Sequence, residues 1–199
     1  MKILAMLSIA AALLVGAPAR TEMKSTPDEE TTEAARAERE PLKLPLASPR
    51  VVVSKGKRRL DLYSGGRVVR TYRVALGKNA SEDKERQGDC RTPEGEFYVC
   101  VKNAASKFYL SLGLSYPNRE DAERGLRDRL ITRGQYERIV AAIGKGLRPP
   151  WDTALGGEIF IHGGGSGSDW TWGCVALDDA DVKELFDAVP KGTQVVIEH

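Results

Sequence analysis

Short apolar runs separated by glycine-containing turns constrain the fold of this sequence more than any other feature. Three strand-like runs follow one another in "RVVVSKGKRRLDLYSGGRVVRTYRVALG": Val51–Ser54, Arg59–Tyr63 and Arg67–Leu76. In the second run Leu60 and Leu62 alternate with charged residues, which is the period of a half-buried strand. "SKGK" and "SGGR" supply turns, because glycine adopts positive φ at little cost. The pattern predicts an antiparallel meander.

The segments that follow alternate between strand and helix patterns. "EGEFYVCVK", "GEIFIHG" and "TQVVIEH" are typical of strands. Asn118 can cap a helix from Arg119 to about Arg129, and a second helix is predicted from about Thr132 to Ile143. "DDADVKELFDAV" has an amphipathic helical pattern. We expect a mainly β (α+β) fold, a sheet or β-sandwich with a helical insertion at about residues 118–147 and one late amphipathic helix.

The first 19 residues resemble a secretory signal. Lys2 precedes an apolar run from Ile3 to Val15 and then small residues, with a cleavage site after Ala19. The run is shorter than the roughly 20 residues that span a bilayer. An uncleaved N-terminal anchor is the alternative. Either reading places the rest of the chain outside the cytoplasm, and we expect no stable membrane insertion after cleavage.

The composition changes near residue 50, which divides a predicted tether from a single folded domain. Residues 20–49 are rich in charge and lack aromatic residues, which predicts a disordered tether. The chain has 199 residues and 41% hydrophobic content, enough for one full core, which we place at residues 50–199. Lys and Arg total 30 against 28 Asp and Glu, so the formal charge of +2 argues against a nucleic-acid partner.

One segment, "EIFIHGGGSGSDWTWGCVALDD", carries the residues suited to chemistry. His162 ends a predicted strand, and Cys174 follows Gly173. A cysteine attacks as the thiolate, which a nearby histidine makes accessible at neutral pH. Because Gly173 permits close backbone approach, amides from Trp172 to Cys174 could form an oxyanion hole. A buried structural cysteine and a structural histidine are the alternatives for each residue alone.

The cysteine count fits an exported chain with one free thiol. Three cysteines cannot all pair within one monomer. Cys90 and Cys100 lie close together in "GDCRTPEGEFYVC", so the simplest disulfide joins them and leaves Cys174 free. Three free thiols are the alternative, because spacing does not fix geometry.

A metal site and a phosphate-binding site are less well supported by this segment than a catalytic cysteine–histidine pair. A catalytic zinc usually has three protein ligands, and only His162 and Cys174 converge, with Asp169 as a weak third. "GGGSGS" lacks the Lys-Ser/Thr that follows a phosphate-binding loop. We therefore expect no metal and no cofactor.

The same segment resembles the L,D-transpeptidases with a YkuD-type catalytic domain. That family has a strand ending in His-Gly, a glycine- and serine-rich loop, and a Ser/Thr-x-Gly-Cys motif, and this chain has "IHGGGSGSDWTWGCVAL". The family's "ALG" and "TPEG" elements also occur, beginning at Ala75 and Thr92. The resemblance extends in order over about residues 50–198.

The resemblance implies a β-sandwich enzyme of the periplasm or cell envelope that acts on peptidoglycan stem peptides. Cys174 would attack the carbonyl after the third stem residue and release terminal D-alanine. His162 would accept and return the proton, and the carbonyl of Gly163 would orient its ring. The residues implied to line the thioester site are Thr171, Trp172 and Gly173.

Two departures from the family pattern leave the acyl acceptor open. Trp172 stands where many members have a second histidine, and Ala176 where many have arginine. A branch with a short loop, part of which hydrolyses the link between murein and a lipoprotein, shares these features. A diaminopimelate amine, a lipoprotein lysine and water all remain as acceptors. A non-catalytic murein-binding module is the alternative, and a thiol pKa well below about 8.5 would favour the enzyme.

Several other residues are candidates for substrate contacts. Arg91 could bind a stem-peptide carboxylate, or be an ordinary surface arginine. Tyr109, Trp151 and Trp170 could wall the cleft, or pack in the core or at its rim. The helical insertion could form a lid, although a solvated hairpin explains its charges equally well.

Overall fold

The computed structural model describes residues 39–199, and the predicted signal sequence and most of the predicted tether lie outside them. The compact unit begins at residue 42. Leu46 packs against the core, and the amide of Gly65 donates to the carbonyl of Ala47 at 2.6 Å. Residues 42–49, which the sequence assigns to the tether, therefore belong to the domain.

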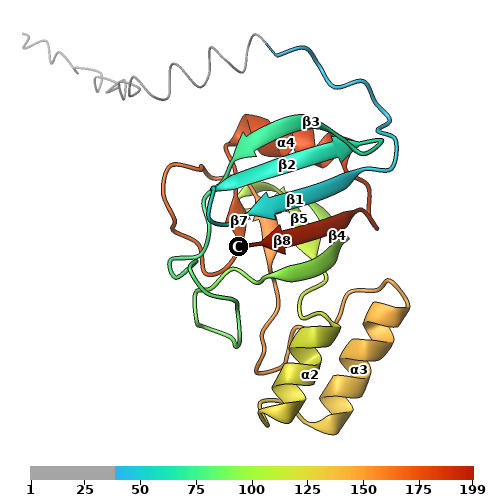
Figure 1. The fold of residues 1–199 in the computed structure, drawn as a ribbon, viewed down its shortest axis with the longest axis vertical. Helices are drawn as coiled ribbons and strands as arrows, with labels where there is room; N and C mark the ends of the chain where they lie inside the picture. Colours follow the sequence, from blue (N-terminus) through green and yellow to red (C-terminus); the bar gives the residue numbers. More distant parts are fainter. Residues whose placement is uncertain (1–38) are drawn as a thin grey trace, which may run out of the picture. The chain divides into compact units, whose positions relative to one another are not determined.

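Eight strands form one sheet in the order β3-β2-β1-β8-β4-β5-β6-β7 (Figure 1). They are β1 (Arg50–Ser54), β2 (Arg59–Ser64), β3 (Arg67–Arg73), β4 (Gly95–Ser106), β5 (Tyr109–Leu114), β6 (Phe160–His162), β7 (Val175–Ala176) and β8 (Gln194–Glu198). The predicted meander is present, because β1 pairs with β2, and β2 with β3, in antiparallel fashion. The mainly β fold with added helices is confirmed. The sequence predicts no strand at β5 or β7.

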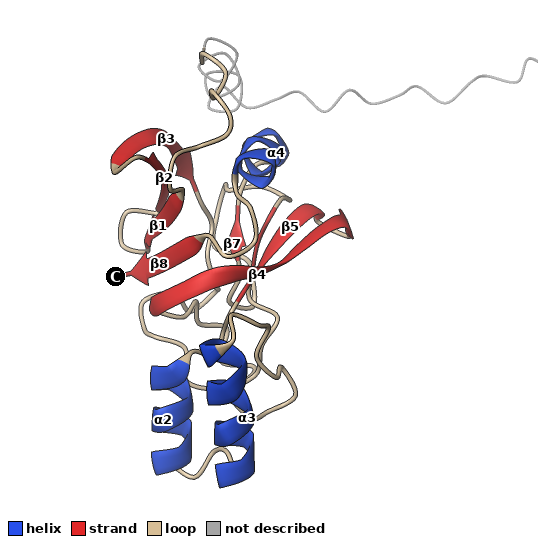
Figure 2. Cartoon of the chain, turned by 90° about the vertical axis from the view of Figure 1, so that its right-hand side faces the viewer, coloured by secondary structure: helices blue, strands red, loops and turns tan. Residues whose placement is uncertain are grey.

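Strand β4 belongs to both halves of the curled sheet. Its residues 95–98 pair with β8, and its later residues pair with β5. The register shifts between Val99 and Val101, where the partner changes. A bulge of this kind bends a strand. Figure 2 shows β4 running from the side of β8 to the side of β5.

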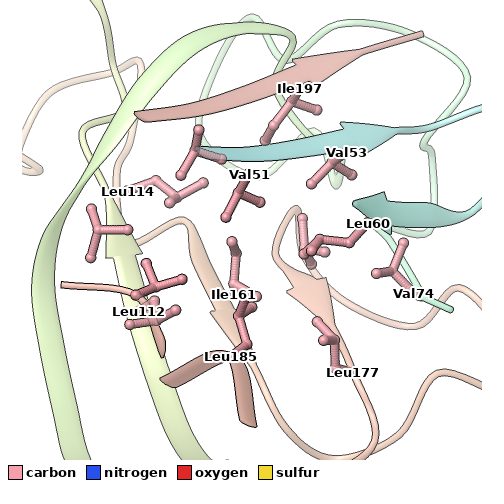
Figure 3. Close-up of a cluster of buried hydrophobic side chains, with 14 of the residues drawn as sticks. Val51, Val53, Leu60, Val74, Leu112, Leu114, Ile161, Leu177, Leu185 and Ile197 are labelled. Carbon is pink, nitrogen blue, oxygen red and sulfur yellow. The ribbon is translucent and has the colours of Figure 1, made fainter. Parts of the chain in front are cut away.

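The core lies between these two halves (Figure 3). Val51 and Val53 from one half meet Leu112 and Ile161 from the other. Helix α4 (Asp179–Ala188) adds Leu185 to the same cluster. The unbroken valine run of β1 reflects its central place, where both faces of the strand are buried.

Helices α2 (Arg119–Arg127) and α3 (Arg133–Gly144) form a hairpin with a small apolar cluster of its own. Asn118 caps α2 as predicted, because its side chain accepts from the amide of Asp121 at 2.9 Å. Thr132 caps α3 in the same way. Figures 1 and 2 show the hairpin at the end of the molecule opposite α4. No helix within residues 39–199 is long and apolar enough to cross a membrane.

Candidate active site

The parallel pairing of β6 with β7 puts the histidine and the cysteine on one face. Ile161 pairs with Val175, and both are fully buried in the core. Because side chains alternate along a strand, His162 and the residue before Val175, Cys174, face the other way. Both line a pocket of about 470 Å³. We call it the histidine pocket, and its lining includes Asn103, Lys107, Phe108, Phe160, His162 and Cys174.

The imidazole of His162 has a defined orientation. Its Nδ1 lies 2.6 Å from the carbonyl oxygen of Gly163. A carbonyl can only accept, so Nδ1 carries the proton and Nε2 keeps its lone pair. Burial lowers the pKa of His162 below its ordinary value. The residue at 163 must be glycine, since a Cβ there would lie 2.9 Å from the carbonyl oxygen of Phe108.

Cys174 is half-buried at the wall of the histidine pocket. Its sulfur accepts from the amide of Phe160 at 3.4 Å and contacts the carbonyl of Glu158 at 3.5 Å. Burial raises the pKa of Cys174 to about 11, although the cation of Lys84 acts in the opposite direction. The resting pair is therefore a neutral thiol and a neutral imidazole, and the low thiol pKa that would favour the enzyme over a non-catalytic module is not found.

A tight turn delivers Cys174 to this position. The hydroxyl of Thr171 donates to the carbonyl of Cys174 at 2.7 Å and accepts from the amide of Gly173 at 3.1 Å. Gly173 has φ of 129°, and a Cβ there would lie 2.6 Å from the carbonyl oxygen of Arg91. Thr171 therefore builds the turn. Because the Gly173 amide is engaged, the amides of Trp172 and Cys174 become the candidate oxyanion donors.

A second, smaller pocket of about 160 Å³ reaches Cys174 from another side. Trp172, 75% exposed, lines it, and Cys174 and Glu158 line both pockets. We call it the tryptophan pocket, and its lining includes Lys84, Gln87, Gly156, Glu158, Trp172 and Cys174. The sulfur is thus at the junction of two recesses.

The glycine-rich loop between β6 and Cys174 is anchored by side chains. Asp169 is bound by the guanidinium of Arg58 at 2.6 Å and by the amide of Leu76 at 2.8 Å. Ser166 is bound through its amide and hydroxyl to Asp178, each at 3.0 Å. Asp169 therefore faces Arg58 and serves as an anchor. Among residues 39–199 no three His, Cys, Asp or Glu side chains gather where they could hold a metal ion.

Other sequence candidates lie away from the two pockets. Arg91 is ion-paired with Glu82 and Glu85 and lines neither pocket, so it contributes its backbone carbonyl beside Gly173. Tyr109 is exposed at the start of β5 and also lines neither.

Of Trp151, Trp170 and the helical hairpin, only Trp170 lies at the site, as the sequence allowed. Trp151 packs edge-on against Phe160 and donates to the carbonyl of Tyr116, which is a packing role. Trp170 lies against His162. No residue of 118–147 lines either pocket, so the hairpin does not cover the site in this structure.

The disulfide expected between Cys90 and Cys100 is not present, and all three cysteines are free thiols. The sulfur of Cys100 lies 3.3 Å from the carbonyl of Gly113, on the strand paired with β4. The sulfur of Cys90 instead contacts the carbonyl of Gly88 at 3.7 Å.

Several pocket residues have no place in the motif that identifies the site. Phe160 could be found from the sequence, since it precedes His162 by two positions in one strand and so shares its face. Phe108, Glu158 and Lys84 come from a hairpin and two loops that only tertiary pairing brings to the sulfur.

Comparison with known proteins identifies the family and the fold. Residues 48–197 match the family model YkuD, the L,D-transpeptidase catalytic domain. Among solved structures the chain is similar to the helical cell shape determining protein Pgp2 from Campylobacter jejuni, with a TM-score of 0.53 and 22% identity. The match covers 76% of this chain and 48% of that chain, so the chain spans about half the length of Pgp2.

An L,D-transpeptidase from Xylanimonas cellulosilytica is also similar, with a TM-score of 0.46 and 20% identity over 84% of this chain and 69% of that chain. Comparison with curated proteins gave no match. The likeness to Pgp2 shows the fold, and the family model covers well over half of the sequence. The chain belongs to the YkuD family of L,D-transpeptidase catalytic domains.

Proposed function

We propose that this protein is an exported peptidoglycan L,D-transpeptidase of the cell envelope, directed there by residues 1–19. Cys174 attacks the carbonyl after the third residue of a stem peptide, forms a thioester and releases terminal D-alanine. An amine acceptor then takes the acyl group. The supporting observation is the placement of Cys174 and His162 on one strand face, lining one pocket.

The protons balance through His162. With its Nδ1 proton committed to Gly163, Nε2 is the basic nitrogen that takes the thiol proton as sulfur attacks. The same proton passes to the departing amine of D-alanine when the C–N bond breaks. In the second half-reaction the acceptor amine gives its proton to Nε2 and attacks the thioester, and the proton returns to the sulfur.

Two groups support negative charge on the sulfur during these steps. The amide of Phe160 points at the sulfur at 3.4 Å, and Lys84 lines the tryptophan pocket beside it. The buried ammonium of Lys84 is fixed by Asp89 at 2.7 Å. Amides at Trp172 and Cys174 would receive the oxyanion of the tetrahedral intermediate.

The location of His162 supports a role for each of the two pockets. The leaving amine must receive its proton from His162, so the leaving group occupies the histidine pocket. By microscopic reversibility the acceptor amine occupies the same place. The acyl portion of the donor then lies toward the tryptophan pocket, with Trp172 as its wall.

Glu158 favours an amine over water as the acceptor. Its side chain is exposed at the junction of the pockets, and no ion-pair partner for it occurs among residues 39–199. An unpaired carboxylate beside the thioester attracts a cationic amine. A diaminopimelate amine and a lipoprotein lysine both satisfy this requirement, whereas hydrolysis does not use it.

Intact-protein mass spectrometry with murein tetrapeptides tests the proposal. We expect a covalent acyl adduct on wild-type protein and none on Cys174→Ala. Cys100→Ala is the matched control, because Cys100 is another half-buried free thiol with a pKa raised by burial. It should form the adduct normally.

Absence of the adduct from wild-type protein that binds murein would instead support the non-catalytic module. Adding an amine and measuring transfer against hydrolysis separates the transpeptidase from a peptidase.

A further inference from the structure

The ring of His162 lies between two aromatic rings from different parts of the chain. Phe108 stacks on the imidazole with centroids 4.5 Å apart and planes 21° apart. Trp170 meets it nearly at right angles, with centroids 5.6 Å apart and planes at 68°. Phe108 and Trp170 also contact each other, at 5.5 Å between centroids. The three rings form one cluster, which we call the aromatic clamp.

Both clamp residues are fixed by hydrogen bonds at their own positions. The carbonyl of Phe108 accepts from the amide of Gly163 at 3.1 Å. The indole of Trp170 donates from Nε1 to the carbonyl of Gly165 at 3.1 Å. Phe108 therefore contacts both the imidazole and the residue whose carbonyl holds its Nδ1.

The hydrogen bond and the rings restrain different motions of the imidazole. The bond from Nδ1 to the carbonyl of Gly163 selects one of the two ring orientations that differ by a half turn about χ2. It leaves the tilt of the ring plane weakly defined, because hydrogen bonds accept a broad angular range. A stacked ring on one face and an edge-on ring restrict that tilt.

We propose that Phe108 and Trp170 are positioning residues that hold the plane of the His162 imidazole, and so preserve the Nδ1 hydrogen bond to Gly163 that leaves Nε2 free to take the Cys174 proton. The inference rests on the role proposed above for His162. Phe108 lies between β4 and β5, on a hairpin tip that also supplies Ser106 and Lys107 to the histidine pocket. The tip of the β4–β5 hairpin therefore lines the pocket proposed for the acceptor amine and also aligns His162, the base that takes the proton of that amine.

Three variants separate positioning from general packing. Phe108→Leu removes the stacked ring and keeps an apolar side chain, whereas Phe108→Tyr keeps the ring. Phe186→Leu is the matched control, because Phe186 packs against the core on α4 and lines neither pocket. We expect Phe108→Leu to lower kcat about 10- to 100-fold, with KM changed less than about 2-fold. Phe186→Leu should retain wild-type kcat, and Phe108→Tyr should lose less kcat than Phe108→Leu because it keeps the stacked ring.

Nuclear magnetic resonance of the imidazole gives a readout that does not depend on turnover. The chain has two histidines, so 15N-labelled His162 is assigned by comparison with His199→Gln. We expect wild type to show a single tautomer protonated at Nδ1, and Phe108→Leu and Trp170→Leu to show averaging between tautomers and a His162 pKa moved up toward 6.5. The acid limb of kcat/KM should move with it.

The outcomes distinguish this inference from the proposed function. Folded Phe108→Leu and Trp170→Leu proteins with wild-type His162 signals and kcat would overturn the clamp and leave the proposed function intact. Should Phe108→Leu fail to fold, Trp170→Leu decides in the same way. A wild-type protein without acyl transfer would overturn the proposed function, while the tautomer measurement would still decide the clamp.

Discussion

Cys174 keeps its proton at rest because its surroundings solvate a thiolate poorly. Burial raises its pKa to about 11, and burial lowers that of His162, so each effect favours the neutral pair. A neutral thiol is a weak nucleophile until a base takes its proton. In the proposed mechanism, activation therefore coincides with substrate attack, when the proton moves to His162, and stray electrophiles meet a less reactive sulfur.

This reading predicts the pH dependence of alkylation at Cys174. In a Cys90→Ala, Cys100→Ala background, the rate of reaction with iodoacetamide should rise about tenfold per pH unit from pH 7 to beyond pH 9, because only the growing thiolate fraction reacts. Removing the nearby cation with Lys84→Gln should raise the thiol pKa further and slow the reaction at every pH below it.

A plateau in the alkylation rate near neutral pH would contradict this prediction, because it would show a thiolate–imidazolium pair. Thiolate absorbance at 240 nm in the same proteins gives an independent titration. Cys174→Ala supplies the background for both measurements.

At the scale of single residues, the sequence marks the two residues proposed to react and misses much of what surrounds them. His162 and Cys174 stand out because a rigid strand and a glycine turn flank them. No sequence pattern distinguishes Phe108 and Lys84, because they reach the site from a hairpin and a loop that are far from it in the sequence. Arg91 looks suited to a carboxylate in the sequence, yet Glu82 and Glu85 already engage it.

Among the elements, the glycine-rich loop differs most from what its composition indicates. Six of the residues 163–170 are glycine or serine, which by themselves give a flexible connection. Asp169 joins the loop to the turn between β1 and β2 through Arg58, and Ser166 joins it to the start of α4. The anchors keep the loop ordered in spite of its composition.

Removing one anchor should loosen the loop without unfolding the domain. We expect Asp169→Ala to speed amide hydrogen exchange across residues 163–170 by about tenfold or more and to lower kcat, because Trp170 follows Asp169 directly. Arg58→Ala should act in the same direction. Asp187→Ala is the control, since Asp187 pairs with Lys183 on the exposed face of α4.

Hydrogen exchange followed by mass spectrometry measures this effect on the free protein. Unchanged exchange in Asp169→Ala would show that the remaining contacts suffice to order the loop. Equal acceleration in Asp187→Ala would show a general loss of stability instead.

The elements also show where sequence patterns stop being informative. Both capped helices of the hairpin are predicted correctly because Asn118 and Thr132 act locally. The two-residue strand β7 has no local signal, and it exists because β6 and an isolated bridge from Ala75 to Ala176 hold it. Strand β5 does have an alternating pattern in "YLSLGL", in which Leu110, Leu112 and Leu114 are all buried.

For the whole molecule, β8 is the strand that joins the β1–β2–β3 meander to β4. It lies parallel to β1 on one side and antiparallel to β4 on the other. Ile197 on this strand is 1% exposed and belongs to the main core. Because Ile197 belongs to the core between the two halves, a cavity at this position should destabilise both halves at once.

Ile197→Ala should destabilise the folded state by about 2–5 kcal/mol, because it leaves a cavity in a packed core. Urea unfolding monitored by tryptophan fluorescence gives the free energy. Gln194→Ala is the control on the same strand, since its side chain is exposed. Loss of acyl transfer at a lower urea concentration than loss of fluorescence would show that the halves unfold separately.

Periodicity predicts the fold class but not the order of the strands. The β1–β2–β3 meander is local, so turns specify it. The placing of β8 between β1 and β4 depends on contacts between residues far apart in the sequence, which no local pattern encodes. The same holds for the division of β4 between two partners.

The meeting of two pockets at one sulfur has a kinetic consequence. If leaving amine and incoming amine share the histidine pocket, the acceptor cannot dock until D-alanine has dissociated, and no ternary complex forms. Turnover is then a double-displacement cycle in which free D-alanine and the acceptor compete for one acyl-enzyme. The local ratio of the two amines, rather than any closing of the helical hairpin, sets the direction of net transfer.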